Sequence, residues 1–306
     1  MASIVDAGST NLQAPPPPEQ GKEAGAFRLA LRALMRSRTG FVGFLVFTGI
    51  VLVCFIGPFF TPDNLPSDTS KIYGPASWSH PFGFDSEGRD VFVQVVDGGR
   101  TVILVGFLAA AISTTIAVVF GALAAYLGGR VDSIIVTATD IVLTVPSIVL
   151  LAVLAAFYRV GSAWALAVIL GVLGWPGLLR AVRAQVFSLK EREYVEAARL
   201  LDLGTPRIVL REILPNMSSF ILMNFVIGMT NAIYAMAGLY LLGLAPMEGS
   251  NWGIMINFAW TRGAIFFEGS LGYILGPVLA ICILQLSLVT MARSFEEILN
   301  PRLRNN

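Results

Sequence analysis

Charged side chains are scarce in this sequence. Asp, Glu, Lys and Arg make up 13% of its 306 residues, against about 25% in an ordinary soluble domain. Hydrophobic residues make up 55%, which is more than one core of this size can bury, so the composition argues against a water-soluble enzyme. The formal net charge of +1 argues against a nucleic-acid-binding protein, because such domains are usually strongly basic.

Cysteine, histidine and lysine are also rare. Cys54 and Cys282 lie within long apolar runs, where neither a disulfide framework nor a thiol metal site is expected. His80 is the single histidine, so any catalytic triad would need this one ring. Among the lysines only Lys22 follows a glycine, and Glu23 comes next. A Gly-Lys-Ser/Thr phosphate loop is therefore absent, and we predict no nucleotide or other cofactor in this chain.

Long stretches without charged residues make up much of the sequence. A bilayer core about 30 Å thick needs about 20 apolar residues in a helix, and six stretches reach that length. We predict an all-α polytopic membrane protein, because helices satisfy their own backbone hydrogen bonds in lipid. A core of 100–293 follows a first span at 40–61 and an extracytoplasmic loop at 62–99. The core contains spans at 101–127, 133–158, 160–183, 217–244 and 270–292, a cytoplasmic loop at 186–215 and an outer loop at 245–269.

The distribution of basic residues predicts the orientation. With the N-terminus in the cytoplasm, 16 of the 21 Lys and Arg residues fall in inside segments, which places both termini in the cytoplasm. Residues 1–26, with the run Pro15–Pro18, predict a disordered tail. Residues 27–39 predict an amphipathic helix on the membrane surface, or else a continuation of the first span. Residues 294–306 form a second cytoplasmic tail.

Small residues recur at every fourth position of the second predicted span. This ridge predicts close contact with another helix, because lipid supplies little hydrophobic drive for helix association. Its members are Ala109, Ser113, Ala117, Gly121 and Ala125.

The loop between the fourth and fifth spans is long and charged, yet it has helical periodicity. Its apolar residues follow the i, i+3, i+4, i+7 pattern of one helix face. Thr205 as a hydroxyl N-cap, followed by Pro206 at the first helical position, indicates a second helix start, and Pro215 is expected to end that helix. We predict a helical hairpin with a tight turn at 202–204, suited to docking into a groove on a partner. The face comprises Tyr194, Ala197, Ala198 and Leu201.

This loop resembles the EAA loop of binding-protein-dependent ABC transporter permeases. The matching residues are Glu196, Ala197, Ala198, Gly204 and 213–215. The stretch 80–90, His-Pro-Phe-Gly-Phe-Asp-Ser-Glu-Gly-Arg-Asp, is similar to the signature of the C-type subunits of dipeptide, oligopeptide and nickel permeases, and Pro146, Arg180 and Arg183 also match. The family usually has its glycine six residues after the glutamate, where this chain has Asp202, a residue type that tolerates left-handed backbone.

The resemblance implies a subunit of an importer in a prokaryotic inner membrane. Its partners would be a second, B-type permease, two ATPase subunits that bind ATP and Mg, and an extracytoplasmic binding protein. The short helix would couple ATPase closure to alternating access. The implied ATPase-docking residues are Tyr194, Glu196, Ala197, Ala198, Arg199, Leu201, Asp202 and Gly204.

Polar residues elsewhere in the spans suggest further roles. Asn224, Gly228, Asn231 and Ala235 share one face of the fifth span, which either lines the pathway or bonds to neighbouring helices. In the outer loop, Trp252, Trp260 and Arg262 are either interfacial anchors or a contact for the binding protein.

The sequence suggests three functional hypotheses. The favoured one is a permease for di- or oligopeptides, with nickel or oligosaccharides as alternative cargo. The second is a proton-coupled secondary carrier that uses Asp140, although a structural pairing of Asp140 with water or with Arg130 is preferred. The third, an intramembrane enzyme, lacks a converging nucleophile and base. A metal site at His80, Asp85, Glu87 and Asp90 is not favoured, because one histidine with loosely spaced carboxylates is a weak ligand set.

Overall fold

The computed structural model describes residues 38–61, 67–158, 162–247 and 249–299. Nearly all of the predicted surface helix at 27–39 lies outside these ranges, as do the N-terminal tail and the end of the C-terminal tail. Within them the chain is helical, and the isolated bridge between Phe84 and Asp90 is the single β interaction. Four helices are long and apolar enough to cross a bilayer, or six if each of two bent pairs forms one span.

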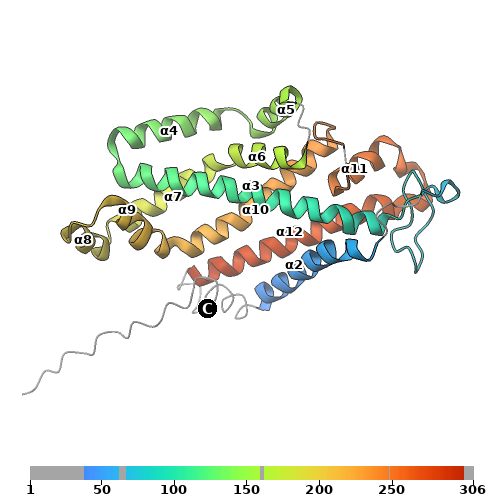
Figure 1. Cartoon of the computed structure of the whole chain (residues 1–306), viewed down its shortest axis with the longest axis horizontal. Helices are drawn as coiled ribbons and strands as arrows, with labels where there is room; N and C mark the ends of the chain where they lie inside the picture. Colours follow the sequence, from blue (N-terminus) through green and yellow to red (C-terminus); the bar gives the residue numbers. More distant parts are fainter. Residues whose placement is uncertain (1–37, 62–66, 159–161, 248, 300–306) are drawn as a thin grey trace, which may run out of the picture.

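The bundle is built around a helix much longer than predicted. α3 runs over Val91–Leu127 and lies beside α2 (Arg38–Ile56), α10 (Ser218–Leu241) and α12 (Leu271–Leu299), as Figure 1 shows. It begins ten residues before the predicted 101 because Asp90 accepts hydrogen bonds from the backbone of Phe92 and Val93. The charge-free stretch marks a bilayer crossing, whereas the cap decides where the helix begins.

Two predicted spans are bent, and a proline lies at each bend. The third consists of α4 (Gly129–Thr144) and α5 (Ser147–Tyr158), which meet at 80°; the fourth consists of α6 (Ala163–Leu173) and α7 (Trp175–Lys190), which meet at 42°. Val145, directly before Pro146, has extended backbone, as expected for a residue that precedes proline. Continuous helices over 133–158 and 160–183 are therefore wrong predictions, because hydropathy does not reveal these breaks.

The short helices lie at opposite ends of the bundle. α8 (Glu193–Leu200) and α9 (Thr205–Ile208) form one end, and α11 (Trp252–Thr261) lies toward the other, near the segment that precedes α3 (Figure 1). The 62–99 and 245–269 loops are thus partly helical, and α12 continues past the predicted limit of 292.

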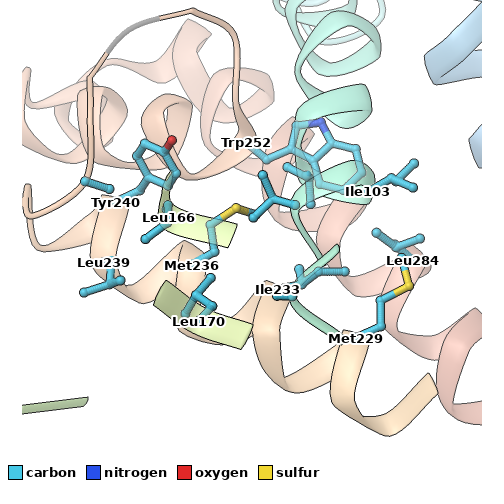
Figure 2. Packing of buried hydrophobic residues seen from close by; sticks show 14 of the residues in the cluster. Ile103, Leu166, Leu170, Met229, Ile233, Met236, Leu239, Tyr240, Trp252 and Leu284 are labelled. Atoms are coloured by element: carbon cyan, nitrogen blue, oxygen red, sulfur yellow. The ribbon is translucent and has the colours of Figure 1, made fainter. Parts of the chain in front are cut away.

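Large side chains from α3, α6, α10, α11 and α12 form the main core. Figure 2 shows Ile103, Leu166, Ile233, Trp252 and Leu284 among them. A second cluster lies at the hairpin end and joins α3 and α7 to the hairpin. It comprises Ala122, Ala125, Val182, Val186, Val195, Ala198, Ile208, Val209, Ile213 and Met217.

The small-residue ridge of α3 faces other helices, as predicted. All five members are buried. Gly171 of α6 packs against Ala109 and Ile112, and Gly121 packs against Leu179 and Val182 of α7. The ridge thus sets how closely α6 and α7 approach α3.

Gly121→Leu is expected to destabilise the packing of α3 on α7 by about 1–3 kcal/mol, the usual cost of overpacking a filled site. A Cβ atom there would lie 3.0 Å from the Leu179 carbonyl oxygen and from a Val182 methyl group. Thermal unfolding of the purified protein in detergent measures the effect. Gly177→Leu is the control, since nothing lies within 4 Å of its added Cβ. Equal unfolding temperatures for the two variants would contradict this packing.

Candidate functional site

The hairpin is a direct extension of two long helices. α8 follows α7 after only Glu191 and Arg192. The second arm, from Thr205, continues into α10, so that 205–241 is a single helical run of 37 residues. The hairpin is therefore firmly attached to the bundle through both arms.

Pro215 does not end the second arm, contrary to the prediction. The preceding residues, Val209–Ile213, form a π-helical turn, and the Leu214 amide bonds to the Val209 carbonyl five residues earlier. A proline clashes with the carbonyl four residues before it in a regular α-helix. The wider π turn makes room for the ring, and a 3-10 turn at Pro215–Met217 leads into α10.

The turn between the arms depends on a left-handed residue. Asp202 has φ +55°, at the position where the resembled family has glycine. Its amide bonds to the Arg199 carbonyl, and the Leu203 amide bonds to the Ala198 carbonyl. This pair of bonds is the Schellman arrangement that closes a helix C-terminus. The next helix begins at Thr205 with Gly204 as its N-cap, so the predicted capping role of the Thr205 hydroxyl is wrong.

The residues predicted to form one docking face divide into two groups. Ala198 is buried in the second core cluster beside Val195, so it cannot contact a separate protein directly. Tyr194, Ala197 and Leu201 are exposed. Ala198 holds the helix against the bundle, and the other three face outward.

Leu200 and Leu210 extend this outward face beyond the sequence-based prediction. Leu200 is 83% exposed and Leu201 is 74% exposed, while Leu210 on the second arm is 62% exposed. Leucines so exposed at the tip of a hairpin indicate a contact surface rather than core. Periodicity assigned only one apolar face to the helix, and therefore missed Leu200 and Leu210.

Charged groups surround these leucines. Glu196 and Arg199 are exposed, and Glu196 forms no ion pair with any residue in the described ranges. The Arg199 guanidinium lies 5.4 Å from the Tyr126 ring centre. Partial burial raises the pKa of Tyr194.

The four predicted residues of α10 lie beside α3 only in part. A Cβ on Gly228 would lie 3.8 Å from Ala110, and the Asn224 side chain donates to the Phe220 carbonyl within α10. Asn231 is exposed, whereas Asn224 and Ala235 are half-buried. An exposed amide within a membrane span needs a polar partner or water, which leaves Asn231 as the strongest candidate for the pathway.

Trp252 is not on the surface at the end of the bundle opposite the hairpin. It is 1% exposed, and its indole nitrogen donates to the Val95 carbonyl at 2.7 Å. Its predicted contact with a separate protein, and its alternative role as an interfacial anchor, are both wrong. Trp260 is 71% exposed, so it remains a candidate contact.

The signature at 80–90 folds around a buried carboxylate. Asp85 accepts hydrogen bonds from the amides of Glu87 and Arg89 and from the side chains of Arg89 and Gln94. Gly88, with φ +72°, passes so close to the Asp68 carbonyl that no Cβ fits. These contacts indicate a structural role for the motif. Within the described ranges, no group of three or more His, Cys, Asp or Glu residues could hold a metal ion.

The outer loop is joined to this motif through an ion pair. Arg262 donates to Glu87 at 2.6 Å and to the Ser86 hydroxyl at 2.8 Å. The hydrogen bond that Arg262 donates to Glu87 is the main cause that raises the pKa of Arg262. Arg262 therefore has a structural partner within the chain, in addition to its predicted contact role.

Asp202→Gly is expected to stabilise the hairpin turn by up to about 1 kcal/mol, because glycine adopts positive φ without a Cβ clash. Asp202→Val is expected to destabilise it by about 1–2 kcal/mol. Hydrogen exchange at the amides of Asp202 and Leu203 measures both effects. Indistinguishable exchange in the two variants would show that the left-handed turn is not formed.

The chain matches known proteins over most of its length. The model for the "binding-protein-dependent transport system inner membrane component" family matches residues 117–305. The model for the "N-terminal TM domain of oligopeptide transport permease C" matches residues 25–74. Together the two matches include both arms of the hairpin and the first span.

Individual relatives agree with the family models. A putative peptide permease protein of Brucella ovis is 34% identical over 239 residues, which is 77% of this chain and 78% of the relative. The dipeptide transport system permease protein DppC of Bacillus subtilis is 30% identical, covering 90% of this chain and 85% of the relative. The oligopeptide transport system permease protein OppC of the same organism is 29% identical, covering 92% of each. This chain is therefore a member of the binding-protein-dependent transport system inner membrane component family.

Proposed function

We propose that this chain is the C-type permease subunit of an ATP-driven importer of di- and oligopeptides. The observation that carries the proposal is the hairpin: an exposed apolar tip on a base that continues into α7 and α10. The names of the relatives, peptide and dipeptide permeases among them, favour peptide cargo over nickel or oligosaccharide.

The hairpin end faces the cytoplasm in this proposal, and its tip docks onto one of two ATPase subunits. Leu200, Leu201 and Tyr194 fill an apolar groove on that subunit, and Glu196 meets a basic residue at the rim. ATP and Mg bind to the ATPase subunits. Binding drives transport only if the ATPases favour one hairpin position over another.

The remaining partners are a B-type permease and an extracytoplasmic binding protein. The exposed faces of α4, α5 and α10, with Asn231 among them, belong to the pathway between the two permeases. The outer end carries Trp260 and the fully exposed Trp78, which are placed to meet the binding protein. Both termini lie in the cytoplasm under this orientation, as the basic residues predict.

Ala197→Trp tests the docking surface. The larger ring projects outward and blocks the groove, so copurification of the ATPase subunits and ATP-driven peptide uptake are both expected to fall at least about tenfold, a loss of about 1.4 kcal/mol of binding. Ala198→Trp is unsuitable, because Ala198 is only 5% exposed and the change would break the core cluster.

The matched control is Ala165→Trp, an exposed alanine on α6 away from the hairpin (Figure 1). It should retain ATPase copurification and uptake. Normal copurification and uptake with Ala197→Trp would refute docking at this surface.

Reconstitution tests the cargo. Proteoliposomes containing both permeases and both ATPases, with the binding protein outside, are expected to accumulate a labelled tripeptide only when ATP is present. Accumulation of nickel or an oligosaccharide in place of the tripeptide would overturn the peptide assignment. Accumulation without the ATPase subunits would overturn the ATP-driven mechanism.

A further inference from the structure

Two ion pairs join α4 to α7. Arg183 donates from Nε and Nη2 to the two carboxylate oxygens of Asp132, each at 2.6 Å. Arg180 donates to Asp140 at 2.5 Å. The pairs thus join α4 to α7 at two points, eight residues apart on α4 and three residues apart on α7. The structural partner of Asp140 is therefore on α7 and is not Arg130.

Few other contacts hold α4 against α7. Among the residues of α4, only Thr139 is buried, and its hydroxyl bonds to the Ile135 carbonyl of its own helix. Large apolar residues of α4 are exposed, including Ile134 and Ile141 at over 60%. Ion pairs therefore form a large part of the α4–α7 contact, unlike the contact of α7 with α3, which is apolar.

α7 has an apolar face that packs against α3 and a basic face that lies toward α4. Leu179, Val182 and Val186 are buried, with Leu179 and Val182 against α3. Arg180 and Arg183 lie on the side toward α4. The Arg183 guanidinium also lies 4.7 Å from the Phe187 ring centre, on which Lys190 stacks from 4.0 Å. The basic face is thus held in place by packing up to the last residue of α7.

This arrangement connects the hairpin to the bent span. Val195 and Ala198 of α8 share one buried cluster with Val182 and Val186 of α7, so a displacement of α8 moves α7. The ion pairs then carry that displacement to α4, which meets α5 at the 80° bend. Apolar contacts could slide along α4, whereas a bidentate Arg–carboxylate pair fixes its register.

We infer that Asp132–Arg183 and Asp140–Arg180 are positioning pairs that transmit hairpin movement to the bent span α4–α5 during transport. The inference rests on the proposed docking of the hairpin onto an ATPase. It assigns Asp140 a mechanical role within the ATP-driven cycle, in place of the proton-carrying role that a secondary carrier would require.

Thiol labelling of the complete reconstituted complex tests the inference without knowledge of the cargo. Cys54→Ala and Cys282→Ser remove the native thiols, and a single cysteine is placed either at Leu201 on the hairpin tip or at Val145 in the bend; both sites are exposed. Labelling rates are compared without nucleotide and after trapping with MgATP and vanadate. With the pairs intact, trapping should protect Leu201→Cys and change the rate at Val145→Cys about fivefold or more.

The combined variant Asp132→Asn and Asp140→Asn should keep the protection at the tip and lose the change at the bend. Reversing each pair, as Asp132→Arg with Arg183→Asp and Asp140→Arg with Arg180→Asp, should restore it. Arg130→Gln is the control, because this exposed arginine of α4 pairs with no described carboxylate.

Three results overturn the inference while docking stands. The first is an unchanged response at the bend in the Asn variant, and the second is no restoration by charge reversal while the tip stays protected. A bend that does not respond in the parent, with the tip protected, overturns it as well. Lack of protection at the tip in the parent overturns the proposed docking, and the inference with it.

Discussion

The close approach of α3 to its neighbours is the contact on which the other helices depend. Lipid tails are as apolar as leucine, so helices in a bilayer associate through tight packing rather than escape from water. The small-residue ridge of α3 permits that packing between positions 109 and 125, and α3 contributes to both buried clusters. One helix therefore connects the core under α11 with the cluster beneath the hairpin. A bulky residue on its ridge would disturb both ends.

Three prolines have different effects because of the backbone around them. Pro146 follows an extended Val145, and the helix bends by 80°. Pro176 begins α7 beside a bend of 42°. Pro215 does not end the helical run, since the preceding π turn accommodates its ring. The hairpin consequently continues into α10 through one arm and into α7 through the other, so a force on its tip reaches two spans at once. α4 receives the same displacement through side-chain charges.

Local patterns predicted much of this molecule. Charge-free length indicated the helical spans, i+4 spacing identified the α3 ridge, and the tolerance of Asp for left-handed backbone indicated that the turn at Asp202 would persist. Predictions that depended on distant residues were less successful. Trp252 is buried because α3 provides the Val95 carbonyl, and Ala198 is buried because the second arm folds back over it. The partner of Asp140 lies 40 positions away, and no local pattern could select Arg180 over Arg130.

The contacts of the outer end also bear on how the protein is made. Asp85 finds its hydrogen-bond partners within nine positions, so this carboxylate is satisfied as soon as its own segment leaves the ribosome. Glu87 has a local partner in Arg89 but meets Arg262 only 175 positions later, and the Tyr73 hydroxyl donates to the Arg262 carbonyl, 189 positions later. At the usual speed of translation of about 5–20 residues per second, that delay is roughly 10–40 s. Until Arg262 has been synthesised, a nascent chain therefore lacks the hydrogen bonds that join the 245–269 loop to the segment before α3.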